Sequence, residues 1–445
     1  MGKLFGTDGI RGRAGEYPVT AEMAEKLGAV LGQIFGTTGK AKILIGKDTR
    51  ESGSMLEEAL CKGLVNAGVA AVKLGVVPTP AVAYLVKELG ADAAVMLTAS
   101  HNPFEDNGMK IFGGNGFKLP DEMEAEVEGL LLAVETPSGL AGAAGSVSEF
   151  PNGGEVYAER VKESVSGVDF SGMKIVLDAG NGAGFQVGVE IFKDLGMDVI
   201  SMATEPDGKN INADCGALHP GKAGRMVVEH GADLGISLDG DADRVIFTDK
   251  EGSEVSGDRT LAICAMSLLK AGKLSSNTMV ATVMSNLGLD EAMRREGVSV
   301  VRTGVGDRLV LERMREEGII FGGENSGHLI FSEYATTGDG ILSALQVCKL
   351  MVESGATLNE LAAIMREYPS TLLNLPVSEK PPIESLAKLQ CLITQANEAF
   401  GDEGRQLIRY SGTEKKIRIL VEHSDEAVVN EWIGKFKKVI EEEIG

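Results

Sequence analysis

The sequence predicts an α/β protein with three related α/β domains that contain mixed sheets, followed by a smaller C-terminal α+β domain. Three observations support this prediction. The chain has 445 residues, 43% of them hydrophobic, which is more than a single core usually organises. Apolar runs of about four to six residues alternate with helical stretches, a pattern typical of parallel or mixed sheets covered on both faces. One such plan recurs three times before residue 371.

The recurring plan is a buried strand, a helix that ends near a glycine, a second strand, and a third strand that ends in a polar loop. Its copies contain the strands of "KILIGKDTR", "NAGVAAVKLGVVPTP" and "AAVMLTASHNP", then "KIVLDAGNGAG", "MDVISMATEPDG" and "ADLGISLDGDADR", then "TMVATVMSNLG", "VSVVRTGVGD" and "IIFGGENSGH". We therefore predict domains at residues 1–152, 153–255 and 256–370.

The last predicted domain, residues 371–445, follows the proline-containing stretch "REYPSTLLNLPVSEKPP". A strand over 372–377, a helix over 385–400 and two strands around "RYSGTE" are expected there. The closing helix is predicted by apolar residues at helical spacing, namely Val428, Val429, Trp432, Ile433, Phe436 and Ile440. A similar stripe at Met23, Leu27, Val30, Leu31 and Ile34 predicts a core-facing helix near the start of the chain.

The charge balance limits the partners of this chain. Lys and Arg number 43 against 65 Asp and Glu, so the formal net charge is −22 and the isoelectric point is near 4.8. Such a field repels nucleic acid and anionic membranes, so neither is an expected partner. A small anionic substrate would need its own cluster of Arg and Lys.

Cysteine usage and hydropathy indicate the compartment. The five cysteines are scattered and form no Cys-x-x-Cys pair: Cys61, Cys215, Cys264, Cys348 and Cys391. This pattern disfavours a disulfide framework or a zinc ribbon, so we expect core cysteines in a reducing compartment. Because no signal-peptide run or membrane-spanning stretch is found, a cytoplasmic location is predicted.

The first polar loop, in "VMLTASHNPFEDNGMKIF" (95–112), presents Ser100 where an apolar strand ends. In open α/β sheets ligands bind outside the carboxyl ends of the strands, so the three polar loops are expected to share one cleft. Most serines at strand ends only complete a turn, and His101 beside Ser100 does not make a Ser-His dyad. Lys110 is expected to present a cation toward the cleft.

The second polar loop, "LDGDADR", carries acidic residues at alternate positions: Asp239, Asp241 and Asp243. Because Gly240 permits a tight path, three carboxylates can face one point and bind a divalent cation, Mg²⁺ in particular. Arg244 and Lys250 stand where a calcium-binding EF-hand needs Gly and Glu. A solvated acidic turn, or Asp239 as a phosphorylated nucleophile, remain alternatives.

The third polar loop, "GGENSGH", places Glu324, Ser326 and His328 at alternate positions. In an extended loop these side chains would point the same way and suit sugar hydroxyls and proton transfer. In the last domain, "RYSGTEKKIR" offers guanidinium groups, hydroxyls and backbone N–H groups for a phosphate, from Arg409, Ser411, Gly412, Thr413 and Arg418. In each case a plain turn is the alternative.

Two nucleotide-binding motifs are not met. In "DAGNGAG", Phe185 stands where the dinucleotide fingerprint requires its third glycine. The phosphate-binding loop of P-loop kinases has no counterpart in the sequence.

Five ordered motifs resemble the α-D-phosphohexomutase superfamily over the whole chain. They are "GTDGIRG" (6–12), "TASHNPFEDNGMK" (98–110), "DGDADR" (239–244), "GGENSGH" (322–328) and "RYSGTE" (409–414). The stretches "EPDGKNINADCGALHP" (205–220), "VMSNLGLD" (283–290) and "TTGDG" (336–340) are similar to the branch that acts on glucosamine phosphates. One departure from the family pattern is the pair Lys415 and Lys416, which affects the expected shape of the phosphate loop.

The resemblance implies four domains around a central cleft and interconversion of glucosamine 6-phosphate and glucosamine 1-phosphate, on the route to UDP-N-acetylglucosamine. It implies a phosphoserine at Ser100 that gives its phosphoryl group to the sugar, and a bisphosphorylated intermediate. One Mg²⁺ per active site would be held by the Ser100 phosphate with Asp239, Asp241 and Asp243. A homodimer is a further implication.

The resemblance also implies roles for the remaining site residues. Arg11, Lys110 and Arg244 would supply cations, and His328 would lie near the reacting end of the sugar. Glu324 and Ser326 would bind sugar hydroxyls, while the last domain would hold the non-reacting phosphate. Alternatives are a phosphomannomutase or phosphoglucomutase, a metal-dependent phosphatase, and a non-catalytic phosphosugar-binding protein.

Overall fold

The predicted strands form four sheets in a computed structural model, which describes residues 4–6, 8–36, 41–133, 145–411 and 415–445. The chain makes two compact units. The first contains Met1–Met284 and Val300–Ala363, and the second contains Ser285–Ser299 and Ile364–Gly445. Among the described helices, none has both the length and the apolar character needed to cross a membrane.

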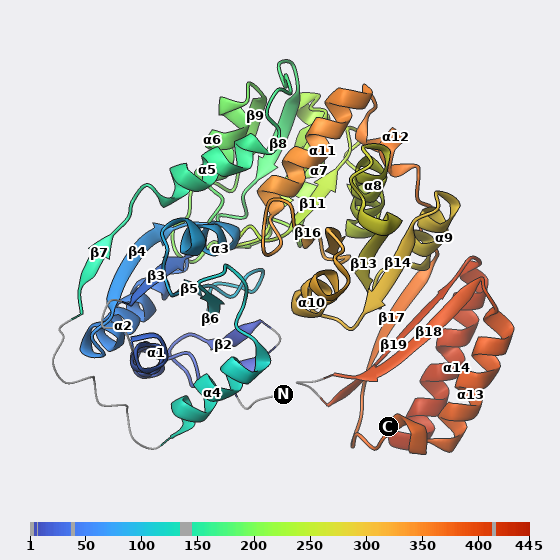
Figure 1. Cartoon of the computed structure of the whole chain (residues 1–445). Coiled ribbons are helices and arrows are strands. Elements are labelled where there is room, and N and C mark those ends of the chain that lie inside the picture. The colour runs from blue at the N-terminus through green and yellow to red at the C-terminus, as the bar shows by residue number, and fades with distance from the viewer. Residues whose placement is uncertain (1–3, 7, 37–40, 134–144, 412–414) are drawn as a thin grey trace. The chain divides into compact units, whose positions relative to one another are not determined.

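The first sheet of the first unit is mixed and seven-stranded (Figure 1). Its strands are, in spatial order, β1 (Phe5–Gly6), β2 (Gly9–Arg13), β6 (Asp106–Gly113), β5 (Ala93–Leu97), β3 (Lys42–Lys47), β4 (Ala70–Val76) and β7 (Val147–Glu149). Strand β3 runs parallel to β4 and β5, whereas β6 runs antiparallel to β5 and β2. The carboxyl ends of β3 and β5 therefore open on the same edge.

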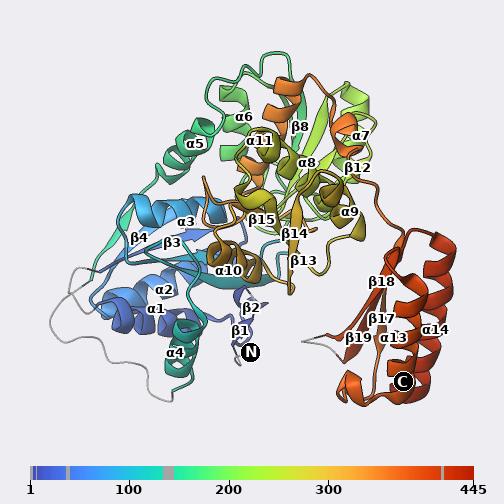
Figure 2. The same cartoon turned by 45° about the vertical axis from the view of Figure 1, so that its right-hand side comes forward.

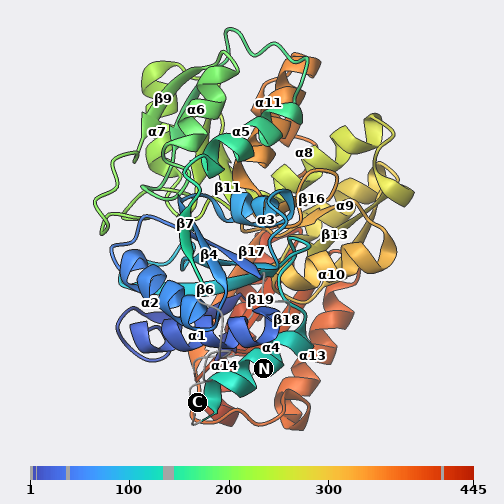
Figure 3. The same cartoon turned by 60° about the vertical axis from the view of Figure 1, so that its left-hand side comes forward.

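Four helices accompany this sheet: α1 (Ala21–Phe35), α2 (Gly53–Asn66), α3 (Thr79–Glu88) and α4 (Asp121–Leu132). Figure 3 shows α1, α2 and α4 gathered on one side of the strands and α3 on the other. The hydroxyl of Thr20 caps α1 by accepting a hydrogen bond from Met23 N at 3.1 Å. The predicted apolar stripe of α1 is confirmed, because Met23, Leu27, Val30 and Leu31 are buried and Ile34 packs against the same core.

The second sheet of this unit is also mixed. Its strands are, in spatial order, β12 (Glu254–Val255), β11 (Val245–Thr248), β10 (Leu234–Leu238), β8 (Lys174–Asp178) and β9 (Asp198–Met202). Its helices are α5 (Gly153–Glu163), α6 (Val187–Asp194) and α7 (Gly221–His230). Strand β10 is buried along its whole length and runs parallel to β8, as expected for a strand covered on both faces.

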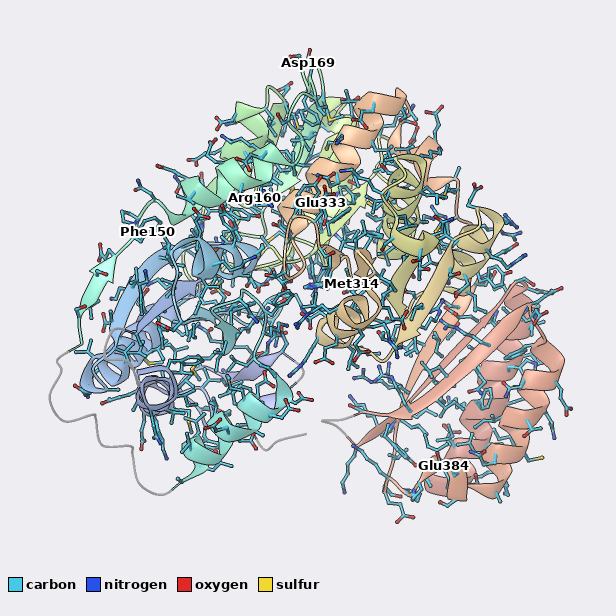
Figure 4. The ribbon with its side chains drawn as sticks, viewed as in Figure 1. Phe150, Arg160, Asp169, Met314, Glu333 and Glu384 are labelled. Atoms are coloured by element: carbon cyan, nitrogen blue, oxygen red, sulfur yellow. The ribbon has the colours of Figure 1, made fainter. Side chains whose placement is uncertain are left out.

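The third sheet has four strands, in the order β14 (Ser299–Thr303), β13 (Thr278–Thr282), β15 (Phe321–Gly323) and β16 (Leu329–Phe331). Its surroundings include α8 (Gly257–Lys270), the 3₁₀ helix η2 (Ser275–Asn277), α10 (Asp307–Glu317), α11 (Gly340–Ser354) and α12 (Leu358–Ala362). Met314, labelled on α10 in Figure 4, is buried in the core between this helix and the sheet. Helix α11 contacts β10 and β11 of the second sheet as well as β16, which joins the two layers.

The second unit contains an antiparallel sheet with α13 (Ala387–Phe400) and α14 (Glu426–Ile444) on one face (Figure 2). Its strands are, in spatial order, β17 (Ser370–Pro376), β19 (Lys416–His423) and β18 (Gly404–Tyr410), and its helices are α9 (Leu287–Arg295), η3 (Ile383–Ser385), α13 (Ala387–Phe400) and α14 (Glu426–Ile444). Trp432 and Phe436 lie in its core. The predicted α/β class with an α+β C-terminal part is confirmed.

One sequence-based expectation about the core is wrong. Four of the cysteines are buried, but Cys391 is exposed on α13. Cys391 lies on the opposite side of α13 from the buried Leu389 and Leu392, so its sulfur faces solvent.

Candidate active site

Ser100 lies at the carboxyl end of β5, in a loop that buries it almost completely. Its relative exposure is 1%, and its backbone has a φ of +52°. The Ser100 hydroxyl donates to Asp239 Oδ2 at 2.7 Å, so the loop after β5 meets the loop after β10. The Ser100 hydroxyl therefore points toward the acidic loop.

Asp239, Asp241 and Asp243 lie together directly after β10. One carboxylate oxygen from each is within 4.8 Å of the others, and all three residues are buried. Asp241 Oδ1 and Asp243 Oδ1 accept no hydrogen bond in the described part of the chain. Buried carboxylate oxygens without donors suit a hard divalent cation, so these residues fit the predicted Mg²⁺.

Lys110 supplies the cation nearest to this acidic loop. Its ammonium donates to Asp241 Oδ2 at 2.8 Å and to Asp243 Oδ2 at 3.0 Å, and it lies 3.1 Å from Asp8 Oδ2. Burial disfavours the charged form of Lys110, but the three carboxylates outweigh it and hold its pKa well above the usual value. The ammonium therefore stays charged.

Burial and neighbouring charges move the pKa values of the carboxyl groups apart. Burial, with the charges of Asp243 and Asp241, raises the pKa of Asp239 well above its usual value. Burial also opposes ionisation of Asp243, but Lys110 and His328 outweigh it and hold the pKa of Asp243 well below the usual value. A bound cation would favour ionisation of all three.

Arg244 and Arg11 add two guanidinium groups to the site. The Arg244 guanidinium donates to His101 Nδ1, which itself lies 3.3 Å from Ser100 Oγ. Burial and the charge of Arg244 lower the pKa of His101 to about 4, so the imidazole is neutral near pH 7. Arg11 pairs with Asp8. The buried Nε atoms of Arg11 and Arg244 donate no hydrogen bond in the described residues, which leaves donors for an anion.

The "GGENSGH" loop differs from the extended conformation expected from its sequence. It is a tight turn between β15 and β16, in which Gly327 N donates to Glu324 O at 3.1 Å and Glu324 N donates to His328 O at 2.9 Å. The turn breaks the alternation of side chains. Glu324 and His328 are buried, whereas Ser326 is exposed at the tip.

His328 is held between two carboxylates. Its Nδ1 lies 3.7 Å from Asp243 Oδ1 and its Nε2 lies 3.6 Å from Asp307 Oδ2. The backbone N–H of Gly338 donates to Nε2 at 3.0 Å, which places the proton of the neutral ring on Nδ1, facing Asp243. Burial opposes protonation, but Asp243 and Asp307 outweigh it and raise the pKa of His328.

Three residues of this cluster were not among the predicted site residues. Lys118 forms ion pairs with both Asp8 and Asp307, so these charges extend the cluster around Lys110 and His328. Asp8 stands inside the motif "GTDGIRG", and its acidic side chain in a glycine-rich strand connection was the available indication. Lys118 stands in none of the quoted stretches, and Asp307 is only the last residue of "VSVVRTGVGD", so only the fold brings the two together.

The candidate phosphate-binding residues lie in the second unit. Arg409 on β18 and Arg418 on β19 are directly opposite each other, and burial together with the charge of Arg418 lowers the pKa of Arg409. Ser411 follows β18 and donates its backbone N–H to Lys416 O at 2.8 Å, while Lys380 donates to Ser411 O at 2.6 Å. Gly412 and Thr413 lie outside the described residues.

Family models match nearly the whole chain. Those for domains I, II and III of phosphoglucomutase/phosphomannomutase match residues 2–137, 155–252 and 256–368, and that for the C-terminal domain matches residues 372–439. The chain belongs to the phosphoglucomutase/phosphomannomutase family. This confirms the superfamily indicated by the five motifs, and it makes this family member an enzyme of the isomerase class.

Two named relatives align with this chain over nearly their full length. A phosphoglucosamine mutase of Geobacter sp. (strain M21) is 48% identical, over 100% of this chain and 99% of that protein. The phosphoglucosamine mutase of Geotalea daltonii is 47% identical with the same coverage. A phosphoglucomutase/phosphomannomutase family protein of Burkholderia thailandensis shares the fold, with a TM-score of 0.82, 23% identity, and coverage of 98% of this chain and 97% of that one.

Proposed function

We propose that the chain interconverts glucosamine 6-phosphate and glucosamine 1-phosphate through a phosphoserine at Ser100 and a bisphosphorylated sugar. The 2.7 Å hydrogen bond from Ser100 Oγ to Asp239 carries the proposal, because it places the serine oxygen beside the acidic loop. The choice of glucosamine as the sugar rests on the relatives named phosphoglucosamine mutase. The product would serve the route to UDP-N-acetylglucosamine, in the cytoplasm.

In each half-reaction a phosphoryl group moves between Ser100 Oγ and a sugar hydroxyl. The bond from phosphorus to the serine oxygen breaks, the bond to the sugar oxygen forms, and the sugar hydroxyl proton leaves to a base in the cluster. The phosphate on the other end of the bisphosphorylated sugar then returns to Ser100 by the reverse steps. Positioning and charge neutralisation dominate such transfers.

The residues of the cluster divide this work. Mg²⁺, when held by the Ser100 phosphate with Asp239, Asp241 and Asp243, would offset the negative charge of the transferring group. The charged Lys110, Arg11 and Arg244 would bind the phosphoryl oxygens, since two of them keep buried N–H groups without acceptors. We place His328 near the reacting end of the sugar, since its Nδ1 lies 3.7 Å from Asp243 Oδ1.

The remaining residues are proposed to bind substrate. Glu324 and the exposed Ser326 would contact sugar hydroxyls. In the second unit, Arg409, Ser411, Gly412, Thr413 and Arg418 would hold the phosphate that is not reacting. These assignments, the four domain ranges and a homodimer are parts of the same proposal.

The test combines mass spectrometry of the Ser100 peptide with a coupled assay of glucosamine 6-phosphate isomerisation, with and without Mg²⁺. Phosphate on that peptide and metal-dependent turnover that is lost in Ser100→Ala are expected. Ser54→Ala, an exposed serine of α2, is the matched control and should keep full activity. Normal turnover in Ser100→Ala would contradict the phosphoserine and favour Asp239 as the nucleophile.

Sugar preference needs its own comparison. The family name covers glucose and mannose phosphates, so glucose 6-phosphate and mannose 6-phosphate are assayed beside the amino sugar. A higher kcat/KM for either neutral sugar would make the chain a phosphoglucomutase or phosphomannomutase. No turnover of any sugar by fully phosphorylated protein would favour a binding role.

A further inference from the structure

The loop that carries Ser100 adopts a conformation that a serine does not favour by itself. Its φ of +52° lies in the left-handed region, which non-glycine residues occupy when surrounding contacts hold them there. Both polar backbone groups of Ser100 have buried partners. These partners reveal what sets the direction of the hydroxyl.

Arg50, just past the carboxyl end of β3, holds the loop from one side. Its side chain is fully buried, and all five of its N–H groups are used. Nε donates to Asp48 at 2.8 Å, Nη2 donates to Ser100 O at 2.9 Å and to Asn102 O at 2.8 Å, and Nη1 donates to Pro103 O and Asp106 O. One guanidinium group thus binds four carbonyls of a single loop.

Asp48 and Thr98 hold the other end of the same residue. The backbone N–H of Ser100 donates to Thr98 Oγ1 at 2.9 Å, and that hydroxyl donates to Asp48 Oδ2 at 2.7 Å. Asp48 also balances the charge of Arg50. The N–H and the C=O of Ser100 are therefore tied to one buried ion pair.

Asn212 holds the loop from the opposite side, and it comes from a different sheet layer. It lies in "EPDGKNINADCGALHP", between β9 and α7, and has a φ of +57°. Its Nδ2 donates to Ser100 O at 2.9 Å and to Asn102 O at 3.1 Å. These are two of the carbonyls that Arg50 binds, so each of the two carbonyls receives one donor from each side.

The neighbouring glycine shows how closely these groups meet. A Cβ on Gly240, between Asp239 and Asp241, would lie 2.5 Å from Ser100 O and 2.8 Å from Asn212 Nδ2. The acidic loop therefore packs directly against the bond between Asn212 and the Ser100 carbonyl. A shift of that amide changes the position of Ser100 relative to Asp239.

We propose that Asn212 is a positioning residue for phosphoryl transfer: its amide, opposite Arg50, holds the Ser100 backbone so that Oγ faces the acidic loop. The inference rests on the proposed phosphoserine function and adds a role for the 205–220 stretch. The side-chain amide of Asn212 donates to carbonyl oxygens of the Ser100 loop, so it is expected to affect the rate of transfer rather than substrate binding.

Single-turnover transfer tests this role. Protein that carries a ³²P-labelled phosphate at Ser100 is mixed with unlabelled glucosamine 6-phosphate, and transfer of the label from protein to sugar is followed by rapid quenching. Asn212→Gly keeps the left-handed backbone accessible but removes the amide. We expect its rate constant to fall about tenfold or more, with KM within about twofold of the unsubstituted protein, because small displacements of a reacting group are costly. A folding defect would instead lower the amplitude.

A second variant and a control sharpen the test. Asn212→Asp is nearly isosteric, but its carboxylate faces two carbonyl oxygens, so a larger fall than in Asn212→Gly is expected. Asn210→Ala is the matched control, because the Asn210 side chain bonds within its own loop: its Nδ2 donates to Glu205 O at 2.9 Å and its Oδ1 accepts from Asp207 N at 3.0 Å. Its rate constant should stay within about twofold of the unsubstituted protein.

The outcomes separate this inference from the function on which it rests. If Asn212→Gly and Asn212→Asp both transfer at the normal rate while Ser100→Ala is inactive, the inference is wrong and the mutase stands. Equal slowing in Asn210→Ala would also overturn it, because loop order would then be responsible. If the unsubstituted protein transfers no phosphoryl group from Ser100, both the function and the inference are wrong.

Discussion

Lys110 donates to one oxygen of Asp241 at 2.8 Å, while the other oxygen of that carboxylate has no hydrogen-bond donor in the described residues. The same division holds at Asp243, whose Oδ2 accepts from Lys110 at 3.0 Å and whose Oδ1 accepts no hydrogen bond there. Lysine thus occupies one side of the acidic loop and leaves the other side for a cation.

Asp241→Asn should weaken metal activation. The substitution removes one charge and offers a single carbonyl oxygen, so the Mg²⁺ concentration for half-maximal turnover should rise about tenfold or more. Titration of turnover with Mg²⁺ measures it. Asp169→Asn, at an exposed position, should leave the titration unchanged. An unchanged midpoint in Asp241→Asn would place the metal elsewhere.

Lys110→Met should be strongly destabilising. The variant keeps the apolar stem but leaves Asp8, Asp241 and Asp243 without their shared cation, and breaking a buried ion pair in this way costs about 3–5 kcal/mol. Urea unfolding without Mg²⁺ measures the loss. Lys62→Met, whose side chain is 64% exposed beside Glu25, should change stability by less than about 1 kcal/mol. A loss of similar size in both variants would contradict this prediction.

Asp339→Asn should change how stability depends on pH. Asp339 caps α11 by accepting from Leu342 N at 2.9 Å, and Tyr157 donates to it at 2.8 Å. Burial raises the pKa of Asp339 to about 6 from 3.8. Between these values the native state holds a proton that the unfolded state has lost, so stability falls as pH rises from about 4 to about 6.

The amide introduced by Asp339→Asn would be neutral at every pH, so the variant does not lose stability through this group as pH rises. Relative to the unsubstituted protein, Asp339→Asn should gain about 3 kcal/mol of unfolding free energy between pH 4 and pH 7, since one pKa unit corresponds to about 1.4 kcal/mol. Urea unfolding at the two pH values gives the difference. Parallel stabilities at both pH values would show that Asp339 keeps the same charge throughout.

Gly240→Ala should reduce turnover sharply. The added Cβ would approach Ser100 O to 2.5 Å, which forces the serine loop or the acidic loop to move. We expect a stability loss of about 1–3 kcal/mol from overpacking, together with a lower kcat. Gly129→Ala on α4 meets no atom within 4 Å and should stabilise by about 0.5–1 kcal/mol. A normal kcat in Gly240→Ala would contradict this prediction, because it would show that the two loops accommodate the Cβ without displacing Ser100 from Asp239.

Arg418→Gln should weaken substrate binding without loss of stability. Arg418 and Arg409 are paired across β18 and β19, where like charges repel each other, so removing one should leave stability equal or slightly higher. If the pair binds the non-reacting phosphate, KM should rise about tenfold. Steady-state kinetics and thermal unfolding report both effects. Arg313→Gln, on the surface of α10, should leave KM unchanged.

The fold class followed from the sequence because it depends on local patterns. The apolar run at 93–97 is long enough for a strand, and the stripes on α1 and α14 recur at helical spacing. The rule that ligands bind at the carboxyl ends of parallel strands indicated the loops at Ser100 and Asp239. The structure brings these two loops into hydrogen-bond contact.

The tertiary structure decided which charges meet. Arg50, Lys118 and Asp307 stand in ordinary sequence contexts, yet they reach the site through contacts that span up to 189 residues. The turn that exposes Ser326 while burying Glu324 and His328 depends on the pairing of β15 with β16. Periodicity within a segment depends only on which face of that segment is apolar, so the helices, the strands and the loops that end them could be predicted from the sequence. The direction of a side chain in a loop depends on groups from other segments, and only the folded chain places those groups.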